Sequence, residues 1–86
     1  MTKLEEKLLE LGYTHRYDSY RQRSEFFKSI KFSEYYIRIT HRLDINIITE
    51  SEISTMYVIT SQQDIDNLQQ AFNQLQKDLE VLKEYA

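Results

Sequence analysis

The feature that most constrains the fold is a long amphipathic segment, SQQDIDNLQQAFNQLQKDLEVLKEYA, at residues 61–86. Its large apolar residues recur at spacings of three and four positions, the pattern of an α-helix with one apolar face. They are Ile65, Leu68, Phe72, Leu75, Leu79 and Leu82. Ser61, with Asp64 three residues on, is its predicted N-cap. Such a helix measures roughly 37 Å, whereas an ordinary strand measures about 17–20 Å, so a small sheet would cover only part of it.

The N-terminal residues predict a second, shorter helix. Thr2 is followed three residues later by Glu5, which is the pattern of a capping box. An apolar stripe follows at helical spacing, formed by Leu4, Leu8 and Leu11. Gly12, the only glycine in the chain, comes next and is suited to the left-handed residue that ends many helices. The sequence therefore predicts a helix over residues 3–11.

Between the helices the hydrophobic period changes from 3.6 to 2, which indicates β-strands. Residues 24–31 are rich in aromatic and β-branched residues and predict one strand. Residues 34–48, EYYIRITHRLDINII, alternate in unbroken phase over a length unusual for one strand. We expect a bend or bulge near residues 41–44 that lets this strand pair with two partners. TMYVIT, residues 55–60, is predicted as the last strand, and the polar TESEIST before it as a surface loop.

These elements predict a single α+β domain over residues 1–86. It comprises an N-terminal helix, a three- to four-stranded antiparallel sheet and a long C-terminal helix packed on one sheet face. Residues 13–23, YTHRYDSYRQR, fit either a first strand or an extended arm.

The apolar face of the long helix has two interpretations. In the first, the whole stripe packs within the chain, its N-terminal half on the sheet and its C-terminal half against the first helix. In the second, the C-terminal half overhangs the sheet and meets another chain, for example a second copy in a homodimer. The residues predicted to make this self-association contact are Leu75, Leu79, Leu82 and Tyr85. The positions beside the stripe are mostly neutral, so charge neither selects nor forbids a homodimer.

The sequence argues against enzymatic chemistry. With one glycine, the chain has no phosphate-binding loop, dinucleotide fingerprint or nucleophile elbow. The absence of cysteine excludes thiolate nucleophiles and thiolate metal sites. The two histidines, His15 and His41, do not have the spacing of metal ligands. We therefore expect a protein that is not an enzyme, with no catalytic, cofactor-binding or metal-binding residues and no cofactor.

Charge is distributed unevenly along the chain, whose formal net charge is −3. Residues 13–42 carry seven Lys/Arg against three Asp/Glu, whereas residues 43–86 carry two Lys against eight Asp/Glu. Aromatic residues are interleaved with the basic ones in the first of these segments, and the alternation places several of both kinds on one sheet face. The residues predicted to bind a partner there are Arg21, Tyr36, Arg38 and Arg42. The leading hypothesis is a non-enzymatic protein-interaction module.

The alternative hypothesis is a single-stranded nucleic-acid binding protein that uses the same basic, tyrosine-rich face. Cations neutralise phosphates, and exposed aromatic rings stack on unpaired bases. A basic aromatic face is also an ordinary solvated sheet face, and the negative net charge favours a protein partner over nucleic acid.

The chain lacks the features of a membrane or exported protein. No apolar run approaches the eighteen or so residues that span a bilayer, and the N-terminal residues lack the basic and apolar regions of a secretory signal. The absence of cysteine fits a reducing compartment. We expect a cytoplasmic protein that does not bind membranes.

The stretches EEKLLELGY and SQQDIDNLQQAFNQLQKDLEVLKEYA resemble those of short uncharacterised proteins of phages and prophages of Gram-positive bacteria. The resemblance rests on the two helical ends and carries over no functional residue. It implies a context in which small accessory proteins bind, and sometimes inhibit, a host or phage protein.

Overall fold

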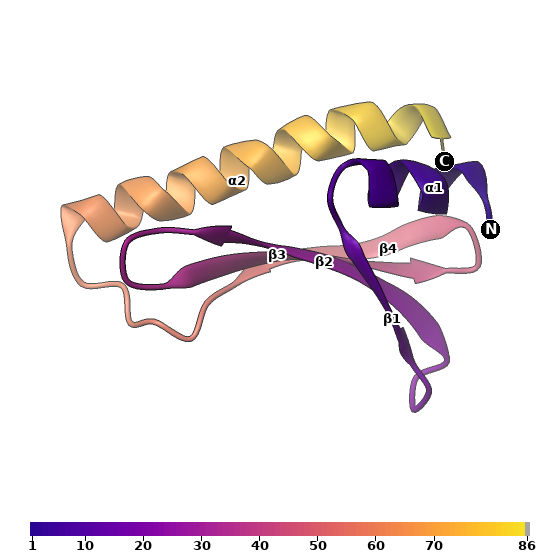
Figure 1. Cartoon of the computed structure of the whole chain (residues 1–86), viewed down its shortest axis with the longest axis horizontal. Coiled ribbons are helices and arrows are strands. Elements are labelled where there is room, and N and C mark those ends of the chain that lie inside the picture. The colour runs from indigo at the N-terminus through magenta and orange to yellow at the C-terminus, as the bar shows by residue number, and fades with distance from the viewer. Residues whose placement is uncertain (86) are drawn as a thin grey trace.

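The computed structural model describes residues 1–85, in which two α-helices lie on one face of a four-stranded antiparallel sheet (Figure 1). The predicted α+β fold is confirmed. Along the chain the elements are α1 (Lys3–Glu10), β1 (Thr14–Asp18), β2 (Arg23–Lys31), β3 (Tyr36–Asp44), β4 (Ile47–Ser54), α2 (Gln62–Leu82) and a terminal 3₁₀ turn, η1 (Lys83–Tyr85). The predicted C-terminal helix extends to Ala86, which lies outside the described residues.

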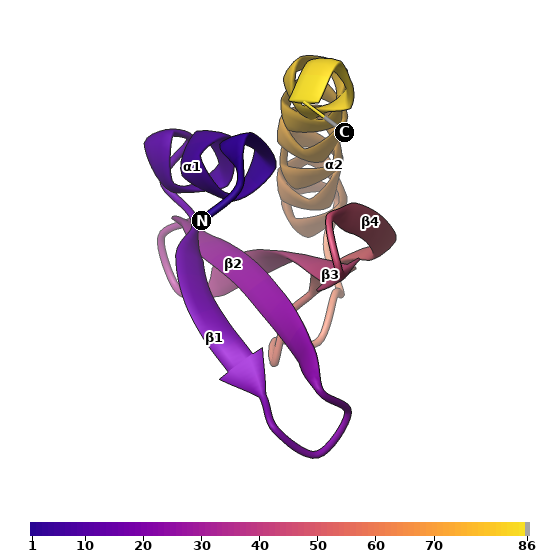
Figure 2. The same ribbon diagram turned by 90° about the vertical axis from the view of Figure 1, so that its right-hand side faces the viewer.

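The strands follow one another across the sheet in the order β1-β2-β3-β4, each antiparallel to the next. Figures 1 and 2 show both helices on one face of this twisted sheet, with α1 beside the C-terminal half of α2. On the other sheet face the described part of the chain places no helix. We call it the open face. Residues 13–23, for which a strand and an arm were the alternatives, contribute strand β1 at one edge.

Local sequence signals set both ends of α1. Thr2 and Glu5 form the predicted capping box, in which each side chain accepts a hydrogen bond from the other residue's backbone N–H. At the other end, Gly12 has a φ of 95°. The amides of Gly12 and Tyr13 donate to the carbonyl oxygens of Leu9 and Leu8, respectively. This is the Schellman arrangement, and it turns the chain directly into β1.

The prediction of a single long strand over residues 34–48 is wrong, because the chain reverses at Ile45 and Asn46 to form a β3–β4 hairpin. Ile45 has a φ of 62°, a conformation that β-branched residues rarely adopt. An irregularity does occur at the position predicted for a bend or bulge, but its extra residue lies in β4. Between Arg42 and Leu43 the register with β4 shifts, which leaves Thr49 as the extra residue. The bulge changes the phase of β4, so that Ile48 packs against the core.

The assignments after the hairpin are also corrected. TESEIST was predicted as a loop, but residues 47–54 form strand β4, and the segment predicted as the last strand, TMYVIT, is an irregular connection. The polarity of β4 misled the prediction. Glu50 and Glu52 pair with Arg42 on the open face, so they are compatible with a strand that has one solvated face.

The predicted N-cap of α2 is confirmed, since Ser61 and Asp64 form a second capping box. The core lies between the helices and the sheet and contains buried side chains from α1, the α1–β1 connection, β2, β3 and α2. They are Leu4, Leu8, Tyr13, Phe26, Ile39, Leu43, Leu75 and Leu82. The C-terminal half of the α2 stripe thus packs against α1 and the sheet, as one interpretation expected. The N-terminal half does not pack on the sheet, because Ile65, Leu68 and Phe72 are 52%, 36% and 43% exposed.

The strained turn residue gives a stability prediction. Replacing Ile45 with glycine removes a positive-φ penalty of about 1–2 kcal/mol, offset in part by the entropy cost of glycine. We expect Ile45→Gly to raise the free energy of unfolding by about 1 kcal/mol in urea denaturation. The matched control is Ile47→Gly, also an exposed isoleucine but within β4. It should lower that free energy, and a decrease for both variants would contradict the strain at Ile45.

Candidate functional site

A pocket of about 650 Å³ opens on the open face where β3 begins and β4 ends. Its walls come from β2, the start of β3, the end of β4 and the connection to α2. The lining residues are Ser29, Tyr35, Tyr36, Arg38, Ser54, Thr55, Met56 and Tyr57. Two of the four residues predicted to bind a partner, Tyr36 and Arg38, therefore meet in one concave site. We call it the Tyr36 pocket.

The connection to α2 is held against the sheet by stacked tyrosines. The rings of Tyr35 and Tyr57 lie 4.2 Å apart and nearly parallel. The hydroxyl of Tyr35 donates a hydrogen bond to Asp64 and accepts one from Asn67, at 2.8 and 3.0 Å. These contacts anchor Tyr35, and with it the Tyr57 side of the pocket, to the first turns of α2. Tyr36 points the other way and is 57% exposed, so its ring is available to a ligand.

Arg38 is the cation of the pocket. Its guanidinium lies over the ring of Phe27, with the Cζ atom 4.5 Å from the ring centroid, and this cation–π contact holds the side chain across the open face. No ion pair within residues 1–85 involves Arg38. Arg38 is also exposed. Its charge is therefore available for an anionic group of a ligand.

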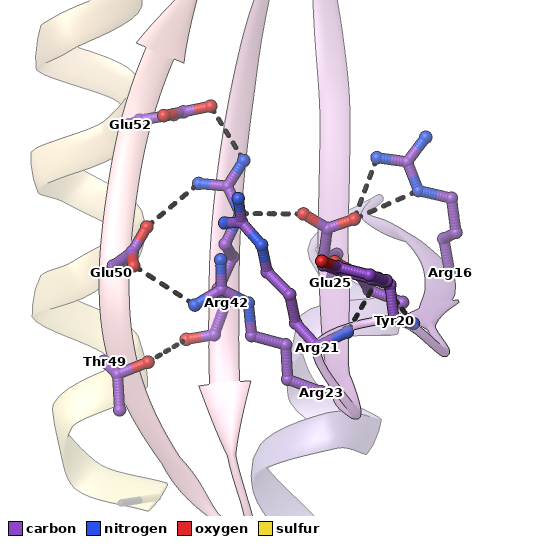
Figure 3. A network of polar contacts seen from close by, with 10 residues as sticks. Arg16, Tyr20, Arg21, Arg23, Glu25, Arg42, Thr49, Glu50 and Glu52 are labelled. Carbon is purple, nitrogen blue, oxygen red and sulfur yellow. Dashed lines mark hydrogen bonds and ion pairs between the residues drawn. The ribbon is translucent and has the colours of Figure 1, made fainter.

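Arg42, two residues farther along the same face, is in a different situation (Figure 3). Its guanidinium donates to Glu25, Glu50 and Glu52 at 2.7, 3.3 and 2.9 Å. The hydrogen bond from Arg42 lowers the pKa of the Glu52 carboxyl. Because three carboxylates surround it, Arg42 is neutralised within the chain, and the structure does not place it in the Tyr36 pocket.

The other arginines predicted on this face are either paired with glutamates or lie away from the pocket. Arg16 pairs with Glu25 at 2.9 Å, and Arg23 pairs with Glu50 at 3.1 Å. Arg21, the fourth residue predicted to bind a partner, lies in the β1–β2 turn, where its backbone N–H bonds to Asp18. This turn is at the opposite end of β2 from the pocket. Sequence alternation identified the face but did not reveal which cations are already paired.

The residues predicted for self-association lie near the C-terminal end of α2. Leu75 and Leu82 are only 7% and 1% exposed, and Leu79 is partly buried against the same core. The predicted overhang of this half of the helix is therefore wrong. Tyr85 is partly exposed, with the Nζ atom of Lys7 5.7 Å from its ring centroid. Leu75, Leu79 and Leu82 thus pack on the core and Tyr85 lies near α1, while Leu79 and Leu82 also line a groove between α2 and β4.

Beneath α2, a network of polar contacts links α2, β2, β3, β4 and the connection between α1 and β1. Lys28 forms an ion pair with Asp78 at 2.6 Å. The hydroxyl of Tyr13 donates to the same carboxylate at 2.7 Å. The imidazole of His41 lies 2.9 Å from the Tyr13 oxygen through Nε2 and 2.7 Å from the Ser51 oxygen through Nδ1. Each of these five side chains has a hydrogen-bond or ion-pair partner within the network, as buried polar groups require.

The direction of the hydrogen bonds follows from Asp78. The Tyr13 proton points to the carboxylate, so the Tyr13 oxygen is left to accept from His41. Nε2 of His41 therefore carries the proton, and Nδ1 accepts from the hydroxyl of Ser51. This order resembles an acid–base relay, but burial lowers the pKa of His41 to about 4. A neutral, weakly basic imidazole is suited to a structural network rather than to proton abstraction at neutral pH.

Two features of the described residues bear on other classes of function. Within residues 1–85 there is no cluster of His, Cys, Asp or Glu side chains that could hold a metal ion. In the same residues no helix is both long and apolar enough to cross a membrane.

No protein-family model, curated protein or solved structure matches this chain.

Sequence reasoning missed two parts of the site. Met56 and Tyr57 were assigned to a strand, so their place in the pocket wall was not foreseen. The pairing of Asp78 with Lys28 and Tyr13 joins residues far apart in the chain and has no local signature. Asp78 interrupts the sheet-facing side of the helix, and a charge at such a position is the signal that could have indicated a buried partner.

Burial of His41 predicts a pH dependence of stability. The pKa of His41 is about 4 in the folded chain and near the ordinary histidine value of 6.5 in the unfolded chain. Between these values the unfolded state binds a proton that the folded state does not, so stability falls as the pH falls. We expect a loss of about 2 kcal/mol between about pH 7 and pH 5. Chemical denaturation at each pH measures this loss.

The control for this measurement is His41→Gln, which keeps a polar side chain at the position but cannot titrate. It should be less stable than the wild type at neutral pH and should lose most of the slope between pH 7 and pH 5. Equal slopes in the two proteins would contradict the assignment of the effect to His41.

Proposed function

We propose that this protein is a non-enzymatic interaction module that binds a protein partner through the Tyr36 pocket. The observation that carries the proposal is the state of Arg38, which has no ion-pair partner within residues 1–85 and borders an aromatic pocket. A concave, mostly apolar site with one available charge is a typical binding site. Aromatic residues and arginine are also enriched where proteins make their strongest contacts.

The pocket indicates the chemistry of the ligand. Tyr36, Met56 and Tyr57 provide apolar walls, and Met56 is fully exposed. An apolar or aromatic side chain of the partner would fit between these walls. The guanidinium of Arg38 would pair with a carboxylate of the same partner segment, since Arg and carboxylate form directed hydrogen bonds. We therefore propose a partner segment in which an acidic residue lies next to a large apolar one.

The charge pattern of the open face favours a protein over nucleic acid. Binding a phosphate backbone needs several unpaired cations along one track. On this face, Arg16, Arg23 and Arg42 are each paired with glutamates. Those glutamates, Glu25 and Glu50 among them, would also repel phosphates. Arg38 and Lys31, which lies opposite Tyr36 on β2, are the cations near the pocket with no ion pair within residues 1–85. One arginine beside an apolar pocket is better suited to a single carboxylate.

The cellular context is part of the proposal. The resemblance of the helical ends to small phage proteins supports an accessory protein, acting in the cytoplasm, that binds or inhibits a host or phage protein. The resemblance gives no partner identity, and the Tyr36 pocket provides the means to find one.

The test is a comparison of pocket and control variants in affinity capture. Tagged wild-type protein and the variants Arg38→Glu and Tyr36→Ala are incubated with nuclease-treated bacterial lysate, and bound proteins are identified by mass spectrometry. Both substituted residues are exposed, so the variants should keep the fold. We expect a stoichiometric partner on the wild type and at least a tenfold lower recovery on both variants.

The matched control is Arg21→Glu, which makes the same change of charge at an exposed arginine outside the pocket. It should recover the partner as well as the wild type does. Equal loss with Arg21→Glu and Arg38→Glu would indicate a general charge effect and contradict the pocket. Recovery unchanged in all three variants would contradict the proposal as a whole.

The second candidate function is binding of single-stranded nucleic acid, and the exposed ring of Tyr36 beside Arg38 favours it. It is tested with a fluorescent oligothymidine by anisotropy at low and moderate salt. Binding that weakens steeply with salt and with Arg38→Ala would support this function over the first. No binding, or binding unaffected by Arg38→Ala, would exclude the pocket as a nucleic-acid site.

A further inference from the structure

The N-terminal half of α2 carries an apolar stripe that no other part of residues 1–85 covers. Ile65, Leu68 and Phe72 are about half exposed, although they continue the heptad pattern whose other half is in the core. Phe72 is seven residues before Leu79, so the two side chains lie within about 20° of each other around the helix. The exposed stripe and Leu79 therefore share one face of α2.

Polar residues fix this rotation of the helix. The positions of α2 that face the sheet in its first half are Asp64, Asn67 and Ala71, all of them buried. Asp64 and Asn67 are bonded to Tyr35. These contacts direct a polar and small-residue face onto the sheet and turn the larger apolar residues sideways. Exposure of the stripe is thus a consequence of the fold and not of loose packing.

The C-terminal half of α2 presents a groove on the side where Leu79 lies. Its volume is about 480 Å³, and it runs between α2 and β4. Its apolar walls are formed by Ile47, Ile48, Leu79 and Leu82. The N-terminal half of the helix thus projects apolar side chains, and the C-terminal half has an apolar groove.

We propose that a second copy of this chain covers the stripe, with the two α2 helices antiparallel about a twofold axis. In this arrangement the projecting residues of each copy, Ile65, Leu68 and Phe72, lie against the groove of the other copy beside Leu79. Both contacts form at once because a twofold interface uses the same patch on each subunit. The contact between stripe and groove therefore forms twice in each dimer, and both contacts bury apolar surface.

Charge restricts where a second copy of the chain can dock. Residues 43–86, which include β4 and α2, have a formal charge of −6 from eight acidic and two basic residues. Two such surfaces can meet only where few carboxylates face each other. Beside Ile65, Leu68 and Phe72, the flanking positions on the solvent side are Gln62, Gln69 and Gln76, which are neutral and exposed. The groove is also lined by charged residues, and these are paired within the chain: Glu80 with Lys83, and Glu50 with Arg42. The stripe is therefore the part of this acidic half that is best suited to self-association.

The free edge of β4 lies on the same side but is less suited to pairing with its own copy. Glu50 and Glu52 project from its open face. Antiparallel pairing centred on Ser51 would place Glu50 of each copy opposite Glu52 of the other. Like charges directly opposite each other destabilise a sheet. The contact is thus between helices, and it leaves the two Tyr36 pockets free on the open faces.

The experiment is sedimentation velocity over a wide range of protein concentration, which gives the masses present and the dissociation constant. We expect the wild type to be a dimer at high concentration and to dissociate on dilution. Phe72→Glu introduces a charge into the stripe and should weaken dimerisation at least tenfold. Ile65→Glu should do the same at the other end of the stripe. Both positions are exposed, and circular dichroism should show an unchanged fold.

The matched control is Gln70→Glu, which adds the same charge at an exposed position on another side of α2. It should dimerise as the wild type does. A wild type that remains a monomer at the highest concentration would overturn the proposal, as would a dimer unaffected by both Phe72→Glu and Ile65→Glu. The result is independent of the Tyr36 pocket, so either proposal can fail alone.

Discussion

The buried carboxylate of Asp78 is the contact on which the arrangement of the molecule depends. Its partners are the ammonium of Lys28 on β2 and the hydroxyl of Tyr13, which follows α1. A buried charge that loses one partner costs several kcal/mol, so α2 cannot rotate or slide over the sheet without breaking these bonds. Through Tyr13 the same network reaches His41 on β3 and thereby the edge strand β4.

Fixing the helix in this way determines what the surface offers. With Asp64, Asn67 and Asp78 directed towards the sheet, the apolar stripe of α2 is turned to one side, where it can meet another molecule. On the opposite face of the sheet, ion pairs around Arg42 neutralise most of the charge, whereas Arg38 in the pocket has no ion pair within residues 1–85. Both candidate surfaces thus follow from where the chain satisfies its own polar groups.

Much of the fold could be predicted because its signals are local. The capping boxes at Thr2 and Ser61 and the reversal at Gly12 depend on residues within a few positions of each other. The β3–β4 hairpin could not be predicted, because Ile45 and Asn46 interrupt neither the alternation nor the hydrophobicity of the segment. Alternation also placed Tyr36 and Arg38 on one face correctly. It could not separate Arg38 from Arg42, since that difference depends on glutamates of two other strands.

The most direct test of this account is the protonation state of His41, measured by long-range ¹H–¹⁵N NMR of its imidazole ring. If Asp78 directs the network, Nε2 carries the proton, Nδ1 is unprotonated, and the ring stays neutral at pH values well below the ordinary pKa of histidine. A ring that carries its proton on Nδ1, or that becomes charged near pH 6.5 like a solvated histidine, would contradict it. In that case Asp78 would not set the position of α2, and the account of both surfaces would lose its basis.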